Sequence, residues 1–358
     1  MRPSASPGTK RMNGADYDVI IAGGGVIGAS IAWRLARNHL RVLLLEAARI
    51  GAEASSAAAG MLAPGGEFND AAMRDFANRS LAMYPRFIRE IEADSGLLIE
   101  FRRTGTAELD APARPGSRPL TRDQLRALVP LARADAASAI FFPDDAIVDP
   151  ASLMTALRAA CLASGVQVQE GSPVTAIQAD SSCARIGDVH ARAAVLAAGA
   201  WSSQVAVTVE GRPNELPRSF PMKGHLLGYR LPAGSLATTV RHNHTYVLQR
   251  ADGFTIAGSS TEDAGFDRAI DPAIVSEIAA RAGALVPALR ALQPESVWIG
   301  FRPGTDSPAP HIGRVTSNNA ASRLWLAYGH YRNGILLAPA TCDRICREIS
   351  AAFAEPRA

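Results

Sequence analysis

The 358-residue sequence predicts an α/β protein (α+β overall) with a Rossmann-like nucleotide-binding domain and a second domain built mainly on an antiparallel sheet. Strand–helix patterns at both ends of the chain predict the first domain, and alternating apolar and polar residues over 218–258 predict the second. We expect each domain to combine non-contiguous segments. These are 16–80, 145–215 and 300–358 for the nucleotide-binding domain, and 81–144 and 216–299 for the second, after a disordered tail at 1–15.

The N-terminal segment has the pattern of a strand, a glycine turn, a helix and a second strand. Residues 16–22 and 41–46 are short apolar runs, typical of buried parallel strands. In the turn Gly23-x-Gly25-x-x-Gly28, the glycines allow a tight bend, close approach of a pyrophosphate and close strand–helix packing. Glu46 ends the second strand, where it can accept hydrogen bonds from an adenosine ribose. The segment predicts a dinucleotide site but suits NAD and FAD equally.

The remaining elements follow from caps, breakers and periodicity. Asn69 is the expected N-cap of a long helix ending at Gly96, and Thr121 caps a short helix. Proline in the first turn starts further helices after Asp149 and Asp271, because that position needs no backbone donor. The expected helices are 69–93, 121–129, 149–163, 271–283 and 333–353, and the expected strands are 98–103, 106–110, 166–169, 174–178, 194–197, 296–302 and 324–328.

Composition excludes several classes of protein. Hydrophobic residues make up 47% of the chain, enough for a large core, and a net charge of +3 gives no reason to expect a nucleic-acid partner. No apolar run approaches the roughly 18–20 residues that span a bilayer, and the first fifteen residues lack the apolar core of a secretory signal. We therefore expect a soluble, cytoplasmic protein. Cys342 and Cys346 lie four apart with no histidine nearby, which favours packed thiols over a metal site.

Four stretches of the chain resemble the D-amino-acid oxidase superfamily of FAD enzymes, most closely the glycine oxidases of bacterial thiamine synthesis. They are the N-terminal β-α-β unit and residues 53–64, 297–305 and 329–341. The resemblance extends over nearly the whole chain and implies FAD as the cofactor. The FAD contacts that it implies are Gly23, Gly25, Val26, Ile27, Gly28, Glu46, Ser55, Ala58, Ala59, Gly60, Met61, Val174, Ala198, Gly199, His330, Tyr331, Arg332, Asn333, Gly334 and Ile335.

The same resemblance implies how a substrate carboxylate is bound. Arginine can grip a carboxylate through two parallel hydrogen bonds, and alternation along 297–302 places Trp298, Gly300 and Arg302 on one strand face. The family pattern marks Arg302 as the carboxylate clamp. It also marks Tyr246 as a second ligand of the carboxylate, with an ordinary half-buried sheet tyrosine as the alternative.

Three further side chains have weaker assignments. His244 is two residues from Tyr246, so we expect both on one strand face, with His244 lining the substrate pocket or packing as a plain sheet histidine. Arg332 is expected to bound the active site with its guanidinium, or to pack its long stem. Lys223 is expected to be a solvent-exposed loop residue rather than a charge beside the flavin.

The implied chemistry needs no acid–base side chain, and no catalytic residue is assigned. The resemblance implies hydride transfer from the α-carbon of glycine, sarcosine or a small D-amino acid to flavin N5. The imine then gives the 2-oxo acid and ammonia, or supplies thiazole assembly for thiamine, and molecular oxygen becomes hydrogen peroxide. The alternatives are an FAD-dependent D-amino-acid dehydrogenase with a non-oxygen acceptor and a non-catalytic nucleotide-binding module. The resemblance also allows a homotetramer.

Overall fold

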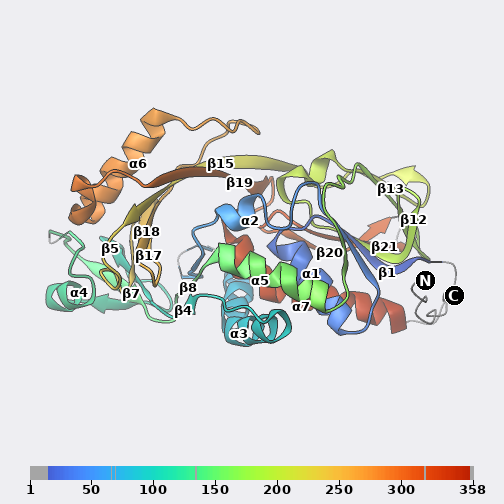
Figure 1. Ribbon diagram of the computed structural model, residues 1–358, viewed down its shortest axis with the longest axis horizontal. Helices are drawn as coiled ribbons and strands as arrows, with labels where there is room; N and C mark the ends of the chain where they lie inside the picture. The colour runs from blue at the N-terminus through green and yellow to red at the C-terminus, as the bar shows by residue number, and fades with distance from the viewer. Residues whose placement is uncertain (1–14, 66, 69, 134, 318–319, 355–358) are drawn as a thin grey trace, which may run out of the picture.

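The computed structural model describes residues 15–354 except 66, 69, 134 and 318–319. The protein is elongated, with one large sheet toward each end of its long axis and a group of helices between them (Figure 1). Residues 1–14 of the predicted tail and the predicted cap Asn69 lie outside the described residues.

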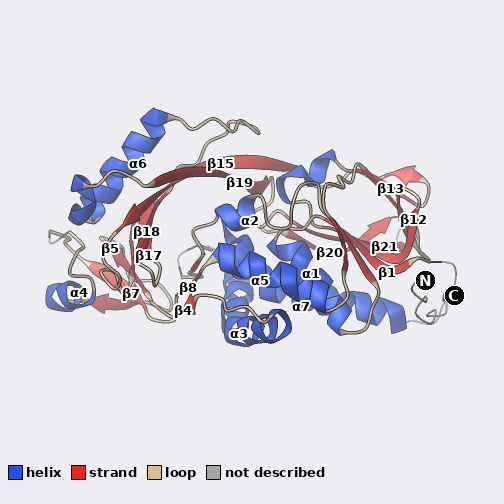
Figure 2. Ribbon diagram, in the orientation of Figure 1, coloured by secondary structure: helices blue, strands red, loops and turns tan. Residues whose placement is uncertain are grey.

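The ten-stranded sheet lies toward the right of the view in Figures 1 and 2. At its centre β1 pairs in parallel with β2 and β12, and β12 pairs in parallel with β21. Burial on both faces explains the apolar runs in these strands. The strands are β1 (Tyr17–Ala22), β2 (Val42–Leu45), β9 (Gln167–Gln169), β10 (Ala176–Ala179), β11 (Ala184–Ile186), β12 (Val189–Leu196), β13 (Ala206–Val209), β14 (Arg212–Pro213), β20 (His311–Ser317) and β21 (Ala320–Tyr328).

The helices beside this sheet bury the largest apolar cluster of the protein, which includes Trp33, Tyr84 and Trp325. They are α1 (Val26–Arg37), α3 (Ala71–Ser95), α5 (Pro150–Ala163) and α7 (Gly334–Ala354). The cap of α3 is Asp70, whose Oδ1 accepts a hydrogen bond of 2.8 Å from the Met73 N–H. Gly96 ends the helix with a φ of 70°, as predicted.

The second sheet has eight strands in the order β19-β15-β18-β17-β16-β5-β7-β6. Its longest pair, β15 with β19, runs antiparallel along the top of the view in Figure 1. A three-stranded sheet, β3-β8-β4, and the helices α2 (Ala54–Ala57), α4 (Arg122–Leu128) and α6 (Pro272–Leu285) complete the regular elements, with short 3-10 helices η1 (Gly199–Gln204), η2 (Pro287–Ala291) and η3 (Tyr331–Asn333). The strands are β3 (Met61–Leu62), β4 (Phe101–Arg102), β5 (Thr106–Leu109), β6 (Arg118–Leu120), β7 (Ala139–Phe142), β8 (Ala146–Val148), β15 (Ser219–Arg230), β16 (Thr239–His242), β17 (Thr245–Gln249), β18 (Phe254–Gly258) and β19 (Ser296–Thr305).

The alternation over 218–258 also predicts a sheet with one solvent-exposed face, and this prediction is wrong. Every residue of β17 is buried. One face of the sheet packs Val247 in a cluster with α6, and the other packs Tyr246 and Leu248 against Ala59 and Ile147 of the neighbouring layer. The alternation of apolar and polar residues here therefore marks two sheet faces that are both buried, each against a different cluster.

Two predicted domain limits, 80/81 and 299/300, fall inside the continuous elements α3 and β19.

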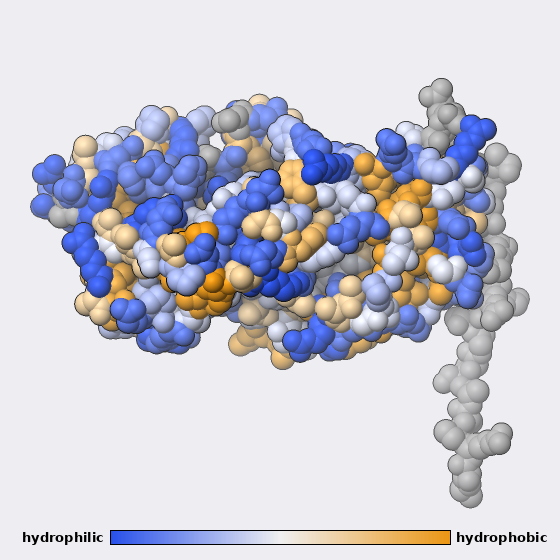
Figure 3. All heavy atoms as spheres, turned by 90° about the horizontal axis from the view of Figure 1, so that it is seen from above, coloured by the Kyte–Doolittle hydropathy of each residue, from blue (hydrophilic) through white to orange (hydrophobic). Residues whose placement is uncertain are grey.

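The face seen in Figure 3 carries scattered apolar patches among hydrophilic residues. Within the described ranges, no helix combines the length and apolar character needed to cross a membrane.

Candidate active site

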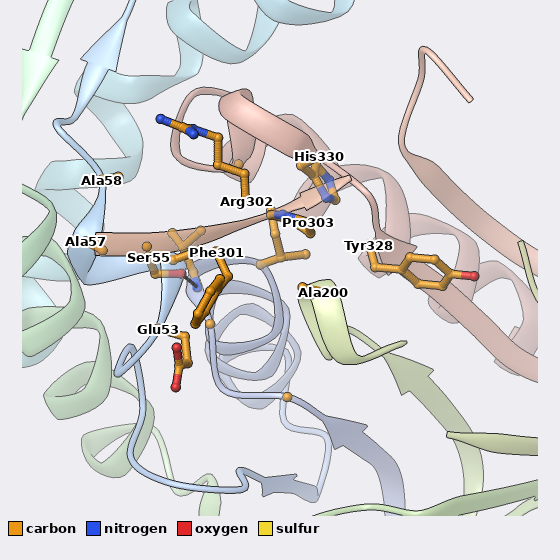
Figure 4. A pocket seen from close by; sticks show the side chains of 18 of the residues that line it. Glu53, Ser55, Ala57, Ala58, Ala200, Phe301, Arg302, Pro303, Tyr328 and His330 are labelled. Atoms are coloured by element: carbon orange, nitrogen blue, oxygen red, sulfur yellow. Dashed lines mark hydrogen bonds between the residues drawn. The ribbon is translucent and has the colours of Figure 1, made fainter. Parts of the chain in front are cut away.

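A single cavity of about 520 Å³ joins the N-terminal glycine turn to the edge of the second sheet. Its walls come from the turn before α1, from α2 and β3, from β15, β17 and β19, and from the start of α7. Figure 4 shows part of this wall, with Arg302 and Phe301 projecting to opposite sides of β19. The size is within the usual range for small-molecule and cofactor sites.

The glycine turn has the close contacts that the motif predicts. Gly23 has a φ of 107°, and a Cβ there would lie 2.4 Å from the Ala197 carbonyl oxygen. A Cβ on Gly28 would lie 2.0 Å from the Gly23 carbonyl oxygen. Only glycine fits at both positions. The turn therefore lies against the end of β12, immediately before Ala198 and Gly199.

Glu46 and Ser55 fix the backbone around the start of α1. The Glu46 carboxylate accepts hydrogen bonds of 2.6 Å from the Gly24 N–H and 2.9 Å from the Ala48 N–H. The Ser55 hydroxyl accepts one of 2.9 Å from the Val26 N–H. The positive end of α1 faces the cavity at this point, which suits an anionic pyrophosphate.

Small residues bring α2 close to β19. A Cβ on Gly300 would lie 2.8 Å from the Ala57 side chain, and the Trp298 indole donates a hydrogen bond of 3.0 Å to the Ala57 carbonyl. Gly60 has a φ of 85°, and a Cβ there would lie 1.9 Å from the Val148 carbonyl oxygen. Because of these contacts, backbone and short side chains form the walls in the middle of the cavity. A flat ring system requires walls of this kind.

Arg302 lies across the neighbouring strand with its guanidinium held by three acceptors. It donates to the Ser259 hydroxyl at 3.0 Å, the Ser260 carbonyl at 3.1 Å and the Lys223 carbonyl at 3.4 Å. Burial lowers the pKa of Arg302 from its ordinary value. The arginine fits because position 224 is glycine: a Cβ there would lie 2.2 Å from Nη1. Sequence reasoning missed Gly224, although a glycine inside an apolar strand was the available signal.

Tyr246 lies beside Arg302 at the same end of the cavity, and its side chain is buried. Burial raises the pKa of the Tyr246 hydroxyl, and the charges of Arg302 and Arg332 act against that rise. Its hydroxyl therefore stays protonated and can donate a hydrogen bond at neutral pH. Sequence reasoning also missed Glu67, which lines the cavity and pairs with Arg332 at 3.6 Å.

His330 is buried at the start of the C-terminal motif. Its Nε2 lies 3.0 Å from the Thr341 hydroxyl, and burial lowers the pKa of His330 to about 3. The imidazole is therefore neutral at physiological pH and shapes the cavity wall without carrying charge.

Two predicted placements are wrong. His244 does not share a strand face with Tyr246, because Asn243 has a φ of 52° and the chain turns between β16 and β17. His244 is exposed in this turn and is not among the described residues lining the cavity. Lys223 is not an exposed loop residue. It is 2% exposed within β15, where its ammonium donates to Asp267 at 2.9 Å and to the Ala269 carbonyl.

The predicted site residues otherwise converge. All of them lie in the described part of the chain, and all except His244 and Gly28 line this one cavity. Gly28 lies behind the turn, against Gly23. Cys342 and Cys346 are buried, with their thiols directed at backbone carbonyls of α1. The described residues include no group of three or more metal-ligating side chains.

Comparisons with known proteins agree with this geometry. Residues 18–347 match the model of the family described as FAD dependent oxidoreductase. The chain is 31% identical to glycine oxidase of Bacillus licheniformis, covering 91% of this chain and 90% of that protein. It is 35% identical to the bifunctional protein ThiO/ThiG of a Synechocystis species, covering 92% of this chain and 51% of that protein. The crystal structure of glycine oxidase from Geobacillus kaustophilus superimposes with a TM-score of 0.84 at 29% identity, covering 94% of this chain and 95% of that one.

Proposed function

The chain belongs to the FAD dependent oxidoreductase family, and from this we propose that it oxidises glycine and other small amines, such as sarcosine and small D-amino acids, with oxygen as the electron acceptor. The products are the 2-oxo acid, ammonia and hydrogen peroxide. The observation that carries the proposal is that Arg302 and Tyr246 border the same cavity as the nucleotide turn.

The residues that line the cavity suit the successive parts of FAD. Glu46 and Val174 line the end suited to adenosine, and the start of α1 faces the middle, where a pyrophosphate would lie. Ala58, Gly60 and the first residues of α7 surround the space for the flavin ring. FAD, when bound here, would supply the hydride acceptor and the route of electrons to oxygen.

The residues of this chain bind and align the substrate. The Arg302 guanidinium binds the substrate carboxylate, and the Tyr246 hydroxyl donates a further hydrogen bond to it. The acceptors around Arg302 restrict its orientation, so the α-carbon is presented to the flavin side of the cavity in one geometry. Backbone N–H groups at Gly334 and Ile335, at the positive end of α7, would favour negative charge on a flavin held there.

Hydrogen peroxide release from the purified yellow protein with glycine in air-saturated buffer tests the proposal, with acetate as a carboxylate that lacks an amine. We expect peroxide with glycine and none with acetate. A flavin bleached by glycine without oxygen, but no peroxide in air, would instead indicate a dehydrogenase. A protein that glycine neither turns over nor bleaches would refute the substrate assignment. Supply of the glycine imine for thiamine synthesis is a further part of the proposal, tested by restoring growth of a thiamine auxotroph lacking this activity.

A further inference from the structure

Glu67 places a negative charge in the cavity at the end where the substrate carboxylate is expected. We infer that the Glu67 carboxylate binds the ammonium group of a zwitterionic amino acid while Arg302 holds its carboxylate. The inference rests on the proposed function and adds a second point of recognition, which selects amino acids over simple carboxylic acids.

Three of the described cavity-lining residues carry carboxylates, and two of these are engaged by closer partners than the third. Glu46 accepts backbone hydrogen bonds at the nucleotide turn. Glu53 pairs with Arg268 at 2.6 Å. Glu67 is the remaining carboxylate, and its charge raises the pKa of Tyr246 while that of Arg302 lowers it. The Arg302 guanidinium and the Glu67 carboxylate therefore both act on the Tyr246 hydroxyl.

Glu67 is held in place but loosely paired. Its Oε1 lies 3.4 Å from Arg241 and 3.6 Å from Arg332, compared with roughly 2.7–2.9 Å for a close ionic hydrogen bond. Arg241 is anchored independently, because it also pairs with Glu108 and donates to the Gly65 carbonyl at 3.0 Å. The carboxylate thus keeps capacity for a further donor, and its side chain is 16% exposed.

This arrangement has opposite effects on binding and on reactivity. A negative charge beside the bound ammonium strengthens zwitterion binding and raises the pKa of that ammonium. The ammonium loses its proton to solvent before the α-carbon gives up a hydride, so Glu67 moves the rise of the reduction rate to higher pH. The other groups facing Glu67 are Arg241, Arg332, Tyr246 and Asp145.

The test compares Glu67→Gln with the wild type under anaerobic conditions. The dissociation constant for glycine is taken from flavin bleaching and that for acetate from the change in the flavin spectrum. We expect Glu67→Gln to weaken glycine binding by about 10-fold or more and to leave acetate binding equal or tighter, because only glycine brings an ammonium. We also expect the midpoint of the bleaching rate against pH to move to lower pH.

Glu295→Gln is the matched control, because Glu295 is an exposed glutamate paired with Arg230 at the far end of β19. Asp145→Asn separates any titration of Asp145, whose pKa burial raises to about 7, from that of the bound amine. Equal weakening of glycine and acetate in Glu67→Gln, or an unmoved midpoint, would overturn the inference. If Glu67→Gln fails to retain FAD, Glu67→Ala replaces it, and an unchanged ratio of glycine to acetate binding there would overturn it too. A wild-type protein that glycine does not bleach would instead refute the proposed function.

Discussion

Replacing Arg302 by alanine removes a partly buried cation that lines the cavity and acts on the Tyr246 hydroxyl. Its guanidinium is oriented by Ser259, Ser260 and the Lys223 carbonyl, and burial lowers its pKa, so it is poorly solvated before substrate arrives. A substrate carboxylate therefore replaces little water and gains a bidentate partner. Without Arg302, the carboxylate loses this bidentate cationic partner.

Losing one partner of a desolvated charge pair costs about 2–5 kcal/mol, which corresponds to a fall of about 30-fold to about 5,000-fold in kcat/KM. We expect most of this in KM, because the clamp holds ground state and transition state alike. The assay is steady-state peroxide release against glycine concentration, with the ratio of flavin to protein absorbance measured on the same sample. That ratio should stay at the wild-type value, because the nucleotide turn is formed by other residues.

Arg302→Lys keeps the charge but not the planar fork, so it should recover only part of the loss. Arg212→Ala, in the exposed strand β14, is the matched control and should leave KM unchanged. A wild-type KM for Arg302→Ala, or a colourless protein, would refute the role assigned to Arg302.

Three further predictions follow from single contacts. Tyr246→Phe should raise KM for glycine by about 10-fold or more at neutral pH, measured by peroxide release. The variant removes a hydroxyl whose raised pKa keeps it protonated, so that it donates to the charged substrate carboxylate. An unchanged KM would contradict this role. Gly28→Ala should yield protein with little bound FAD and a lower Tm, because the new Cβ would lie 2.0 Å from the Gly23 carbonyl oxygen; full flavin content would contradict this. Asp145→Asn should become progressively more stable than the wild type as pH rises from about 4 to about 7, because burial raises the folded-state pKa of Asp145 to about 7 and ionisation there costs up to about 4 kcal/mol. Urea unfolding at several pH values measures this, and a pH-independent difference would refute it.

Local sequence signals predicted elements and turns well. The Asp149-Pro150 and Asp271-Pro272 pairs begin helices as expected, because a carboxylate cap and a proline in the first turn act within a few residues. The N-cap of α3 is Asp70, one residue after the predicted Asn69, because the Asp70 carboxylate accepts the Met73 N–H. The antiparallel pattern over 218–258 predicted strands correctly but not their burial, since alternation does not reveal what covers each face.

Side chains whose position depends on distant partners escaped sequence reasoning. Lys223 is buried because Asp267 and the Ala269 carbonyl close over it, and His244 is exposed because Asn243 bends the chain just before it. Neither the burial of Lys223 nor the exposure of His244 is indicated by the type of residue at that position.

The sequence by itself determined the nucleotide turn, because the glycine spacing constrains backbone that is contiguous in the chain. Only the tertiary structure brought Glu67, Gly224 and Arg302 to one end of a cavity. Those residues belong to a loop and two strands, and their proximity depends on the antiparallel pairing of β15 with β19 and the packing of that ribbon on α2. Long-range contacts of this kind depend on the packing of the whole chain, which no local spacing encodes.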